Sequence, residues 1–482
     1  MKKFLEIIKN KWLIKGTTTI LLAVIIIACY IGLTILADNI EIEDLDFTEK
    51  KLYSLSDETK SKIKDLDEDI TIQLINLDDY TYIGEYAEKY ETVSDKITIE
   101  KIDDLSSRVD LKTEYELDDT DSLIVVKTGD KEKTLSLYDL YTIDYSTGQQ
   151  IDTTEEAITN AIVEITIDEK PQIYIYSGKT YYQPEQSLST ITTQLTDEAN
   201  EVEYLDILST GSVPEDCDCL IITTLAEDMS EMERDKILEY IQRGGKILFL
   251  TSQNILDVDT PNLDAILNQY GISIEYGAIF EQDTTKMLQN APEFAIVDTS
   301  ASFMSDIGMN LQMCLVDAGR IQLADDTKQE ELGVEYETIA STGDTAFVRT
   351  NFETNSYTRT DADSEEGSFI VGARATKKIS DDVSSEIIIY SNELCASNLQ
   401  IPVSNQYYMY AVDLYNNKDV ILNSISHLTE RTDTITIRKT DETEKYTVSE
   451  QEDIVIKVII FTVPAIIILI GLVIWVVRKR RK

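Results

Sequence analysis

The sequence has a single histidine, five cysteines and seven prolines among its 482 residues. With His427 alone, a Ser-His or Cys-His nucleophile pair with a further orienting group is difficult to assemble, so we expect this histidine to be structural. The cysteines show neither a disulfide framework nor the spacing of a zinc site. We therefore expect no catalytic residue, no metal and no cofactor, and we predict that the protein is not an enzyme.

Basic residues are also scarce, since 43 Lys and Arg stand against 89 Asp and Glu and the net charge is −46. Residues 1–16 nevertheless contain five lysines and one glutamate, and residues 478–482 are RKRRK. These two ends contribute +9, so the rest of the chain carries −55. Such a charge excludes binding of nucleic acid or anionic lipid by electrostatic attraction. It fits either a ligand or partner that carries cations or a soluble, cation-tolerant surface.

Two long uncharged runs adjoin the basic ends. At about 1.5 Å per residue, residues 17–37 and 458–477 would each span roughly 30 Å, the thickness of a hydrocarbon core. Pro464 is no objection, because transmembrane helices tolerate proline. We predict two transmembrane helices in the cell membrane, with residues 1–16 and 478–482 in the cytoplasm and the bulk of the chain outside it.

The first uncharged run has two other interpretations. Ile26-Ile27-Ala28-Cys29 resembles a lipobox, which would make Cys29 a lipidated N-terminus after cleavage. However, the apolar stretch IGLTILA follows soon after, where a lipoprotein normally becomes polar. The second interpretation is a cleaved signal peptide, but no clear small-x-small cleavage site precedes the polar region. An uncleaved anchor fits the residues better than either.

Residues 38–165 predict a membrane-proximal α/β domain. A stripe at Leu55, Thr59 and Ile63 predicts a short helix with Ser54 or Ser56 as its N-cap. Alternating or apolar runs then predict a strand, a helix, a second strand and a hairpin of two strands, in the stretches DITIQLI, 83–90, KITIEKI, SLIVVKTG and KEKTLSL. This order suggests a thioredoxin-like layout, without the Cys-x-x-Cys of a redox protein. TTEEAITNAIVEITI predicts a helix that leads to the next domain.

Residues 166–431 predict a doubly wound α/β domain on a parallel sheet covered on both faces. Apolar strands alternate there with helices, and the strands are expected in PQIYIYSG, EVEYLDI, DCLIITT, KILFLTSQ and SEIIIYSN. Ser230 and Glu233 have the spacing of a capping box at one helix start. Residues 285–370 have weaker periodicity and predict a β-rich insertion. Residues 432–457 predict a charged stalk.

The strand ends of this domain suggest a binding site. In an open parallel sheet a ligand usually lies beyond the carboxyl ends of the strands. Those ends carry the candidate residues Ser177, Gly178, Lys179, Thr223, Thr224, Ser252, Gln253, Asn392 and Glu393. Their side chains fit polar contacts with a ligand such as a sugar, and they equally fit turn residues that close buried strands. Gly178-Lys179-Thr180 is no Walker loop, because Ile173 occupies the position that needs glycine.

Several stretches, in this order, resemble the gliding-motility-associated, GldG-like auxiliary family of ABC transport systems. The segment around residues 46–59 is similar to the family's entrance motif D-x-T-x-x-K-x-Y-S-L-S-x-x-T, with matches at Asp46, Thr48, Lys51, Tyr53, Ser54, Leu55, Ser56 and Thr59. Later segments also resemble the family: VPEDCDCLIITTLAEDMSEMERDKILEYIQRGGKILFL, PNLDAILNQYGISIEYGAIF and NKDVILNSISHLTERTDTITIRK. Many members carry Gly-His-Gly-Glu where this chain has Gly178-Lys179-Thr180-Tyr181, so the histidine and the acid are missing here.

The resemblance implies an exported domain of glutamine-amidotransferase-like shape that works beside an ABC permease and a separate ATPase. We therefore predict a non-ATPase auxiliary subunit of an ABC-type transport or envelope/motility complex. Such a subunit would bind a substrate or partner outside the membrane, for example an envelope polymer, and couple it to the permease. Two alternatives stay open, a structural envelope scaffold and a glycan-acting hydrolase.

Overall fold

The computed structural model describes residues 54–64, 66–144, 149–167, 169–304, 311–353, 357–402 and 408–430. The predicted membrane spans 17–37 and 458–477, the stalk 432–457 and both basic ends lie outside these residues. In the described part of the chain, no helix is long and apolar enough to cross a membrane.

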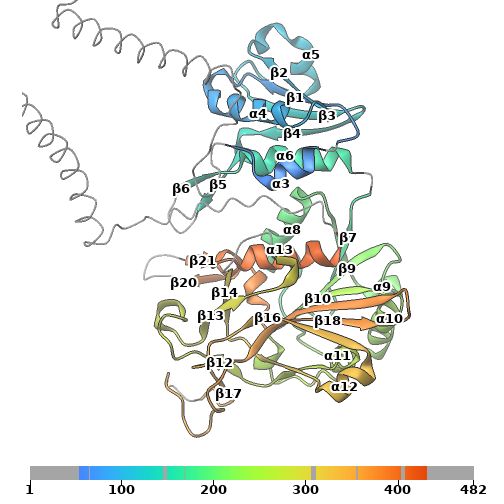
Figure 1. The fold of residues 1–482 in the computed structure, drawn as a ribbon, viewed down its shortest axis with the longest axis vertical. Helices are drawn as coiled ribbons and strands as arrows, with labels where there is room; N and C mark the ends of the chain where they lie inside the picture. The colour runs from blue at the N-terminus through green and yellow to red at the C-terminus, as the bar shows by residue number, and fades with distance from the viewer. Residues whose placement is uncertain are drawn as a thin grey trace, which may run out of the picture. The chain divides into compact units, whose positions relative to one another are not determined.

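The N-terminal part contains a four-stranded sheet in the order β2-β1-β3-β4 (Figure 1). β1 pairs in parallel with β2 and antiparallel with β3, and β3 and β4 form a hairpin. This confirms the β-α-β unit followed by a hairpin that the sequence predicts. The elements are α3 (Asp57–Lys64), β1 (Ile70–Ile75), α4 (Thr81–Val93), β2 (Ile97–Ile102), α5 (Val109–Glu114), β3 (Leu123–Thr128), β4 (Lys131–Ser136), β5 (Tyr141–Asp144), β6 (Gln149–Asp152) and α6 (Thr154–Thr166).

A buried carboxylate of α6 holds the start of α3. Ser56 is the N-cap, because its Oγ accepts from the backbone N–H of Thr59 at 3.1 Å. The Thr59 hydroxyl and the Ser56 N–H both donate to Glu155 Oε1 at 2.7 Å. Tyr86 donates to the other oxygen of Glu155 at 2.6 Å. Two residues of the entrance motif therefore anchor the helix through a partner about a hundred residues away, which no local pattern indicates.

The C-terminal part contains a nine-stranded sheet in the order β14-β13-β16-β18-β19-β10-β9-β7-β8. Its strands are β7 (Gln172–Tyr176), β8 (Glu201–Leu205), β9 (Cys217–Ile222), β10 (Lys246–Leu250), β13 (Phe294–Thr299), β14 (Gln312–Val316), β16 (Val334–Ser341), β18 (Ile370–Lys378) and β19 (Ser384–Tyr390). The five strands from β8 to β19 run parallel. The other four are antiparallel.

The strands that the sequence indicates for a parallel sheet are therefore parallel as predicted, and the sheet continues with antiparallel strands from other segments. Residues 285–370 are rich in strands, as the sequence predicts, but β13, β14 and β16 extend the main sheet instead of forming an insertion apart from it. The periodicity is weak there because a strand such as β16 has neither a continuous buried run nor a regular alternation, since Val334 and the pair Ile339-Ala340 are buried and the residues between them are not. The parallel strand β9 is instead almost continuously buried.

Helices cover both faces of the parallel half, as a doubly wound domain requires. Ile173 and Ile175 of β7 belong to one hydrophobic cluster with α8 and α13. Tyr174 and Tyr176 of the same strand belong to a second cluster with α10 and α11. The helices are α7 (Pro184–Ser187), α8 (Ser189–Asp197), α9 (Ile207–Thr210), α10 (Glu231–Gln242), α11 (Pro261–Leu267), α12 (Asp326–Leu332) and α13 (Asn417–Leu428).

Two local features of this part are a helix cap and a bend. The predicted capping box is confirmed, because Ser230 Oγ accepts from the N–H of Glu233 and Glu233 Oε2 accepts from the N–H of Ser230. The stretch ISIEYGAIF does not form one continuous strand, because the chain bends at Gly277, whose φ is 125°. The short strands outside the main sheet are β11 (Ile272–Glu275), β12 (Ala278–Phe280), β15 (Arg320–Leu323), β17 (Phe347–Arg349), β20 (Gln400–Pro402) and β21 (Tyr408–Tyr410). On the two sides of the bend, β11 pairs with β15 and β12 pairs with β17, in two separate antiparallel sheets.

Candidate functional site

Four neighbouring parallel strands, β7, β9, β10 and β19, end at the same edge of the nine-stranded sheet. This is the edge where open parallel sheets usually place their ligands. All nine residues predicted from the sequence follow one of these four strands. We call this region the strand-end site, and the contacts below show which of the nine side chains meet there.

Glu393 lies at the centre of the strand-end site and is completely buried. Its Oε2 accepts from the N–H of Thr224 at 3.0 Å, and its own N–H donates to Ser252 Oγ at 3.1 Å. The N–H of Ser252 in turn donates to Thr224 Oγ1 at 2.8 Å. A closed ring of hydrogen bonds therefore joins the ends of β9, β10 and β19 through three of the predicted residues.

The second carboxyl oxygen of Glu393 has no partner. Oε1 is buried and makes no hydrogen bond within the described residues, and no ion pair to Glu393 occurs among them. Burial raises the pKa of Glu393 to about 7, although the hydrogen bonds from Thr224 act in the opposite direction. A buried carboxyl group with an open oxygen and a raised pKa is a feature typical of functional sites.

Gln253 places a second open group beside Glu393. Its Oε1 accepts from the N–H of Leu225 at 3.2 Å, whereas its Nε2 has no partner within the described residues. The carboxyl of Glu393 and the carboxamide of Gln253 are thus both held by backbone N–H groups just after β9, those of the consecutive residues Thr224 and Leu225. One leaves an acceptor open and the other leaves a donor open. The buried hydroxyl of Thr223 also lacks a partner.

The loop that follows β7 crosses the end of β9. The carbonyl of Lys179 accepts from the N–H of Ala226 at 2.8 Å, and the N–H of Tyr181 donates to the carbonyl of Thr224 at 2.7 Å. The side chain of Lys179 pairs with Glu227 at 3.5 Å, so its charge is compensated outside the ring around Glu393. We call residues 179–182 the cover loop, since its backbone is held directly to the residues that follow β9.

Two other predicted residues shape the β7 end through their backbones. The N–H of Ser177 donates to the carbonyl of Leu205 at 3.0 Å and so continues the pairing of β7 with β8. A Cβ on Gly178 would lie 2.5 Å from the hydroxyl oxygen of Tyr176, so only glycine fits there. The sequence correctly places both residues at the edge, and the structure gives them a backbone role.

The candidate residue Asn392 uses its side chain in hydrogen bonds within the fold. Its amide nitrogen donates to the carbonyl of Val316, and its amide oxygen accepts from the N–H of Cys395 at 2.9 Å. Both ends of the side chain are therefore used to fix the turn after β19 against the end of β14.

Two tyrosines of the cover loop are not among the nine residues predicted from the sequence. The rings of Tyr181 and Tyr182 pack edge to face with centroids 4.9 Å apart, and Tyr181 is 50% exposed. Burial raises the pKa of Tyr182, and the neighbouring Tyr181 and Glu393 raise it further. Tyr182 therefore lies close enough to Glu393 to sense its charge. Consecutive tyrosines directly after a strand end would have been the signal.

The four cysteines in the described part of the chain are free and buried. Cys395, in the turn that follows β19, donates to the carbonyl of Asn392 at 3.1 Å, and burial raises the pKa of its thiol. Among the described residues, no group of three or more His, Cys, Asp or Glu side chains is placed to hold a metal ion.

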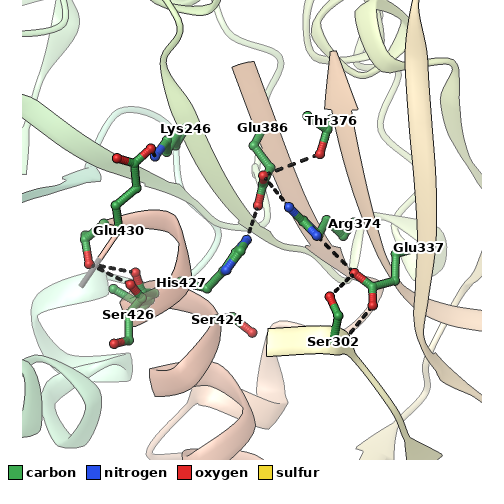
Figure 2. A network of polar contacts seen from close by, with 12 residues as sticks. Lys246, Ser302, Glu337, Arg374, Thr376, Glu386, Ser424, Ser426, His427 and Glu430 are labelled. Carbon is green, nitrogen blue, oxygen red and sulfur yellow. Dashed lines mark hydrogen bonds and ion pairs between the residues drawn. The ribbon is translucent and has the colours of Figure 1, made fainter. Parts of the chain in front are cut away.

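His427 takes part in a different network, which lies on β16, β18, β19 and α13 (Figure 2). Its Nε2 lies 2.7 Å from Glu386 Oε1, and its ring stacks on Phe303 with centroids 4.5 Å apart. Arg374 donates to Glu386 at 2.9 Å and to Glu337 at 3.1 Å. Burial would raise the pKa of Glu386, but the hydrogen bonds and charges of His427 and Arg374 outweigh it and lower this pKa to about 2. The partner of the histidine is thus a carboxylate held by an arginine.

The mixed sheet with its covering helices defines an α/β domain. The polar residues at its strand ends define a candidate binding site. The chain matches the family described as an ABC-type uncharacterized transport system over residues 170–424, which is more than half of its length. The chain therefore belongs to this ABC transport auxiliary family. No curated protein sequence matches it.

Three solved structures resemble this chain at low identity. The mmIFT52 N-terminal domain is 14% identical with a TM-score of 0.37, and the match covers 54% of this chain and 97% of that one. A ThuA-like protein from Bacteroides uniformis is 11% identical with a TM-score of 0.33, covering 54% and 93%. A second ThuA-like protein, from Parabacteroides merdae, is 9% identical with a TM-score of 0.26, covering 50% and 84%. At these scores the likenesses bear on neither ligand nor activity.

Proposed function

We propose that this chain is the non-ATPase auxiliary subunit of a GldG-like ABC-type transport or envelope/motility complex. The observation that carries the proposal is the family match over residues 170–424. The ordered resemblance of the entrance motif and the later segments supports the narrower GldG-like assignment. In this role the chain binds a substrate or partner and couples it to an ABC permease that is served by a separate ATPase.

The proposal includes a two-pass arrangement in the cell membrane. The uncharged runs 17–37 and 458–477 are its spans, and the basic segments beside them stay in the cytoplasm. The described residues then lie outside the cytoplasm. Their acidic surface suits this place, because it is repelled by anionic lipid headgroups and remains hydrated.

The strand-end site supports binding as the task of the larger sheet. Glu393 and Gln253 each leave a polar atom open at the edge where parallel sheets hold ligands. The described cysteines are buried thiols with raised pKa values, and His427 is engaged by Glu386. We therefore propose a binding protein without catalytic activity of its own.

The proposal is tested by purifying the tagged full-length chain from its native membrane in mild detergents and identifying its partners by mass spectrometry. An ABC ATPase and a multi-span permease in stoichiometric amounts are the expected result. The matched control is a tagged chain that lacks residues 54–430 but keeps both predicted spans, so that partners of the exterior part are separated from detergent-dependent contaminants. If neither transport component is recovered with the full chain in several detergents, the proposal is wrong and a scaffold role is favoured.

The hydrolase alternative has its own test. Purified full-length protein incubated with isolated cell-wall glycan should release no reducing ends above the level of a heat-inactivated sample. Release that disappears in Glu393→Gln would overturn the proposed absence of catalysis.

A further inference from the structure

The open atoms of the strand-end site define the chemistry of a ligand that would complete them. Glu393 Oε1 is an open acceptor, and Gln253 Nε2 is an open donor, both on side chains fixed to consecutive backbone N–H groups. A group that carries a donor beside an acceptor would satisfy both at once. Neighbouring hydroxyls of a sugar ring have this arrangement, because each hydroxyl both donates and accepts.

The charges around the site disfavour ligands with a negative charge. Above a pH of about 7, where Glu393 is ionised, an anion would be repelled by its carboxylate, and the lysine of the cover loop, Lys179, is already paired with Glu227. A small cation would meet the donor of Gln253 and only one carboxyl oxygen, which is far fewer oxygen ligands than a calcium ion takes. The site therefore suits a neutral molecule.

The cover loop supplies an aromatic surface beside these polar atoms. The ring of Tyr181 is half exposed and is supported edge to face by Tyr182, whose pKa senses the charge of Glu393. A binding site for a small molecule combines apolar or aromatic surface with a few placed polar groups. The apolar face of a sugar ring can lie on such a tyrosine while its hydroxyls reach the carboxyl and the amide.

The cover loop must move before a ligand reaches Glu393, because that side chain is fully buried. Two backbone hydrogen bonds hold the loop to Thr224 and Ala226. Lys179 has a φ of 53°, a conformation that costs energy for a residue other than glycine, and it follows Gly178 directly. Opening of the loop therefore breaks these two hydrogen bonds and the Lys179–Glu227 pair, moves Tyr182 from the hydrophobic cluster around Cys314, and relieves the strain at Lys179.

We propose that the strand-end site, taken as the binding site of the proposed function, holds a neutral sugar unit of a glycan. The sugar hydroxyls donate to Glu393 Oε1 and accept from Gln253 Nε2, and the sugar ring lies against Tyr181 once the cover loop opens. No bond is made or broken, since the interaction is one of recognition.

The test is a glycan array that carries neutral, uronic-acid and sialylated glycans, probed with the labelled full-length protein in detergent. Neutral glycans are expected to bind, and acidic glycans are not. Tyr181→Ala and Gln253→Ala should each reduce binding of the neutral glycans at least tenfold. Tyr357→Ala is the matched control, because this tyrosine is 64% exposed and belongs to another part of the chain, and it should leave binding unchanged.

Three results would overturn the proposal: binding of no neutral glycan, binding of acidic glycans only, or neutral-glycan binding that is unchanged in both Tyr181→Ala and Gln253→Ala. Tyr181 is half exposed, so its variant folds even if changes at the buried Glu393 do not. Failure of this inference is distinguishable from failure of the proposed function. If the ABC ATPase and permease are recovered with a chain that binds no glycan, only the sugar inference is wrong and the proposed function stands.

Discussion

Two glutamates seven residues apart, Glu386 within β19 and Glu393 just beyond its end, are treated in opposite ways by the same fold. Both are buried, but Glu386 contacts His427 and Arg374, and its pKa falls to about 2. Glu393 contacts only uncharged donors, and its pKa rises to about 7. The two carboxyls thus differ in their neighbours, although the residue type is the same and both lie in or directly after β19.

This difference separates a structural role from a candidate binding role. The charge of Glu386 is compensated, so the network joins β16, β18 and β19 to the final helix α13. Glu393 is removed from water without a positive charge beside it among the described residues, and one of its oxygens makes no hydrogen bond. Burying an acid in this way lowers stability, and proteins accept such a cost mainly where a group serves binding or catalysis.

The largest expected effect comes from removing the arginine that compensates the charge of Glu386. Arg374→Ala leaves Glu386 and Glu337 without their shared cation, and loss of one partner of a buried ion pair costs about 3–5 kcal/mol. Because both acids keep some exposure, we expect a loss near the lower end, about 3 kcal/mol. Urea unfolding of the purified protein measures it.

The control for this change is Lys378→Ala, whose ion pair with Asp381 is mostly exposed. Exposed pairs contribute roughly 0–1 kcal/mol, so this variant should unfold close to the wild-type midpoint. Equal losses in the two variants would mean that the network around Glu386 has no special weight.

The second effect concerns Glu393, whose charge has no compensating partner among the described residues, and it depends on pH. The folded-state pKa of Glu393 is about 7, above its ordinary value of 4.5. As pH rises from 4.5 to 7, the unfolded chain loses its proton first, so the wild-type protein loses stability over this window, by about 3 kcal/mol. Glu393→Gln cannot ionise, and it should be more stable than wild type at pH 8 and equal to it at pH 4. Melting temperatures at the two pH values check this, and a variant that is less stable at pH 8 would contradict it.

The third effect concerns Glu386, whose contribution to stability depends on pH in the opposite direction to that of Glu393. The folded-state pKa of Glu386 is about 2, below its ordinary value, so its contribution is present above pH 4.5 and is lost as pH falls toward 2. Glu386→Gln should be less stable than wild type by about 2 kcal/mol at pH 7, and the gap should close in acid. Denaturant unfolding at pH 7, 4 and 3 follows the gap. A gap that stays constant would show that packing, and not the charge, explains the loss.

The smallest expected effect tests whether the buried hydroxyl of Thr223 in the strand-end site lacks a hydrogen-bond partner. Thr223→Val replaces a buried hydroxyl without a partner by a methyl group of similar size. Since no hydrogen bond is lost, we expect a stability change within about 0.5 kcal/mol or a slight gain. Thr59→Val is the contrasting control, because its hydroxyl donates to Glu155 and its loss leaves a buried acceptor short of a donor. A large loss in Thr223→Val would mean that its hydroxyl is bonded after all.

Much of the fold follows from patterns of neighbouring residues. The capping box at Ser230 and Glu233, the β-α-β unit with its hairpin and the two helical faces of the parallel half are all present as predicted. The antiparallel half was mistaken for an insertion, since its strands carry mixed burial and their pairing joins distant segments. The domain boundary near residue 166 stays a prediction.

The sequence by itself determined which residues follow the parallel strands, because a strand and the polar residues after it are contiguous in the chain. It also determined the acidic charge and the scarcity of histidine and cysteine. Only the tertiary structure decided that Thr224 meets Glu393 across 169 positions, that Asn392 is used in a turn and that Gln253 is left with an open donor. The physical reason is that strand order and burial set each side chain's partners, and these depend on segments far apart in the sequence.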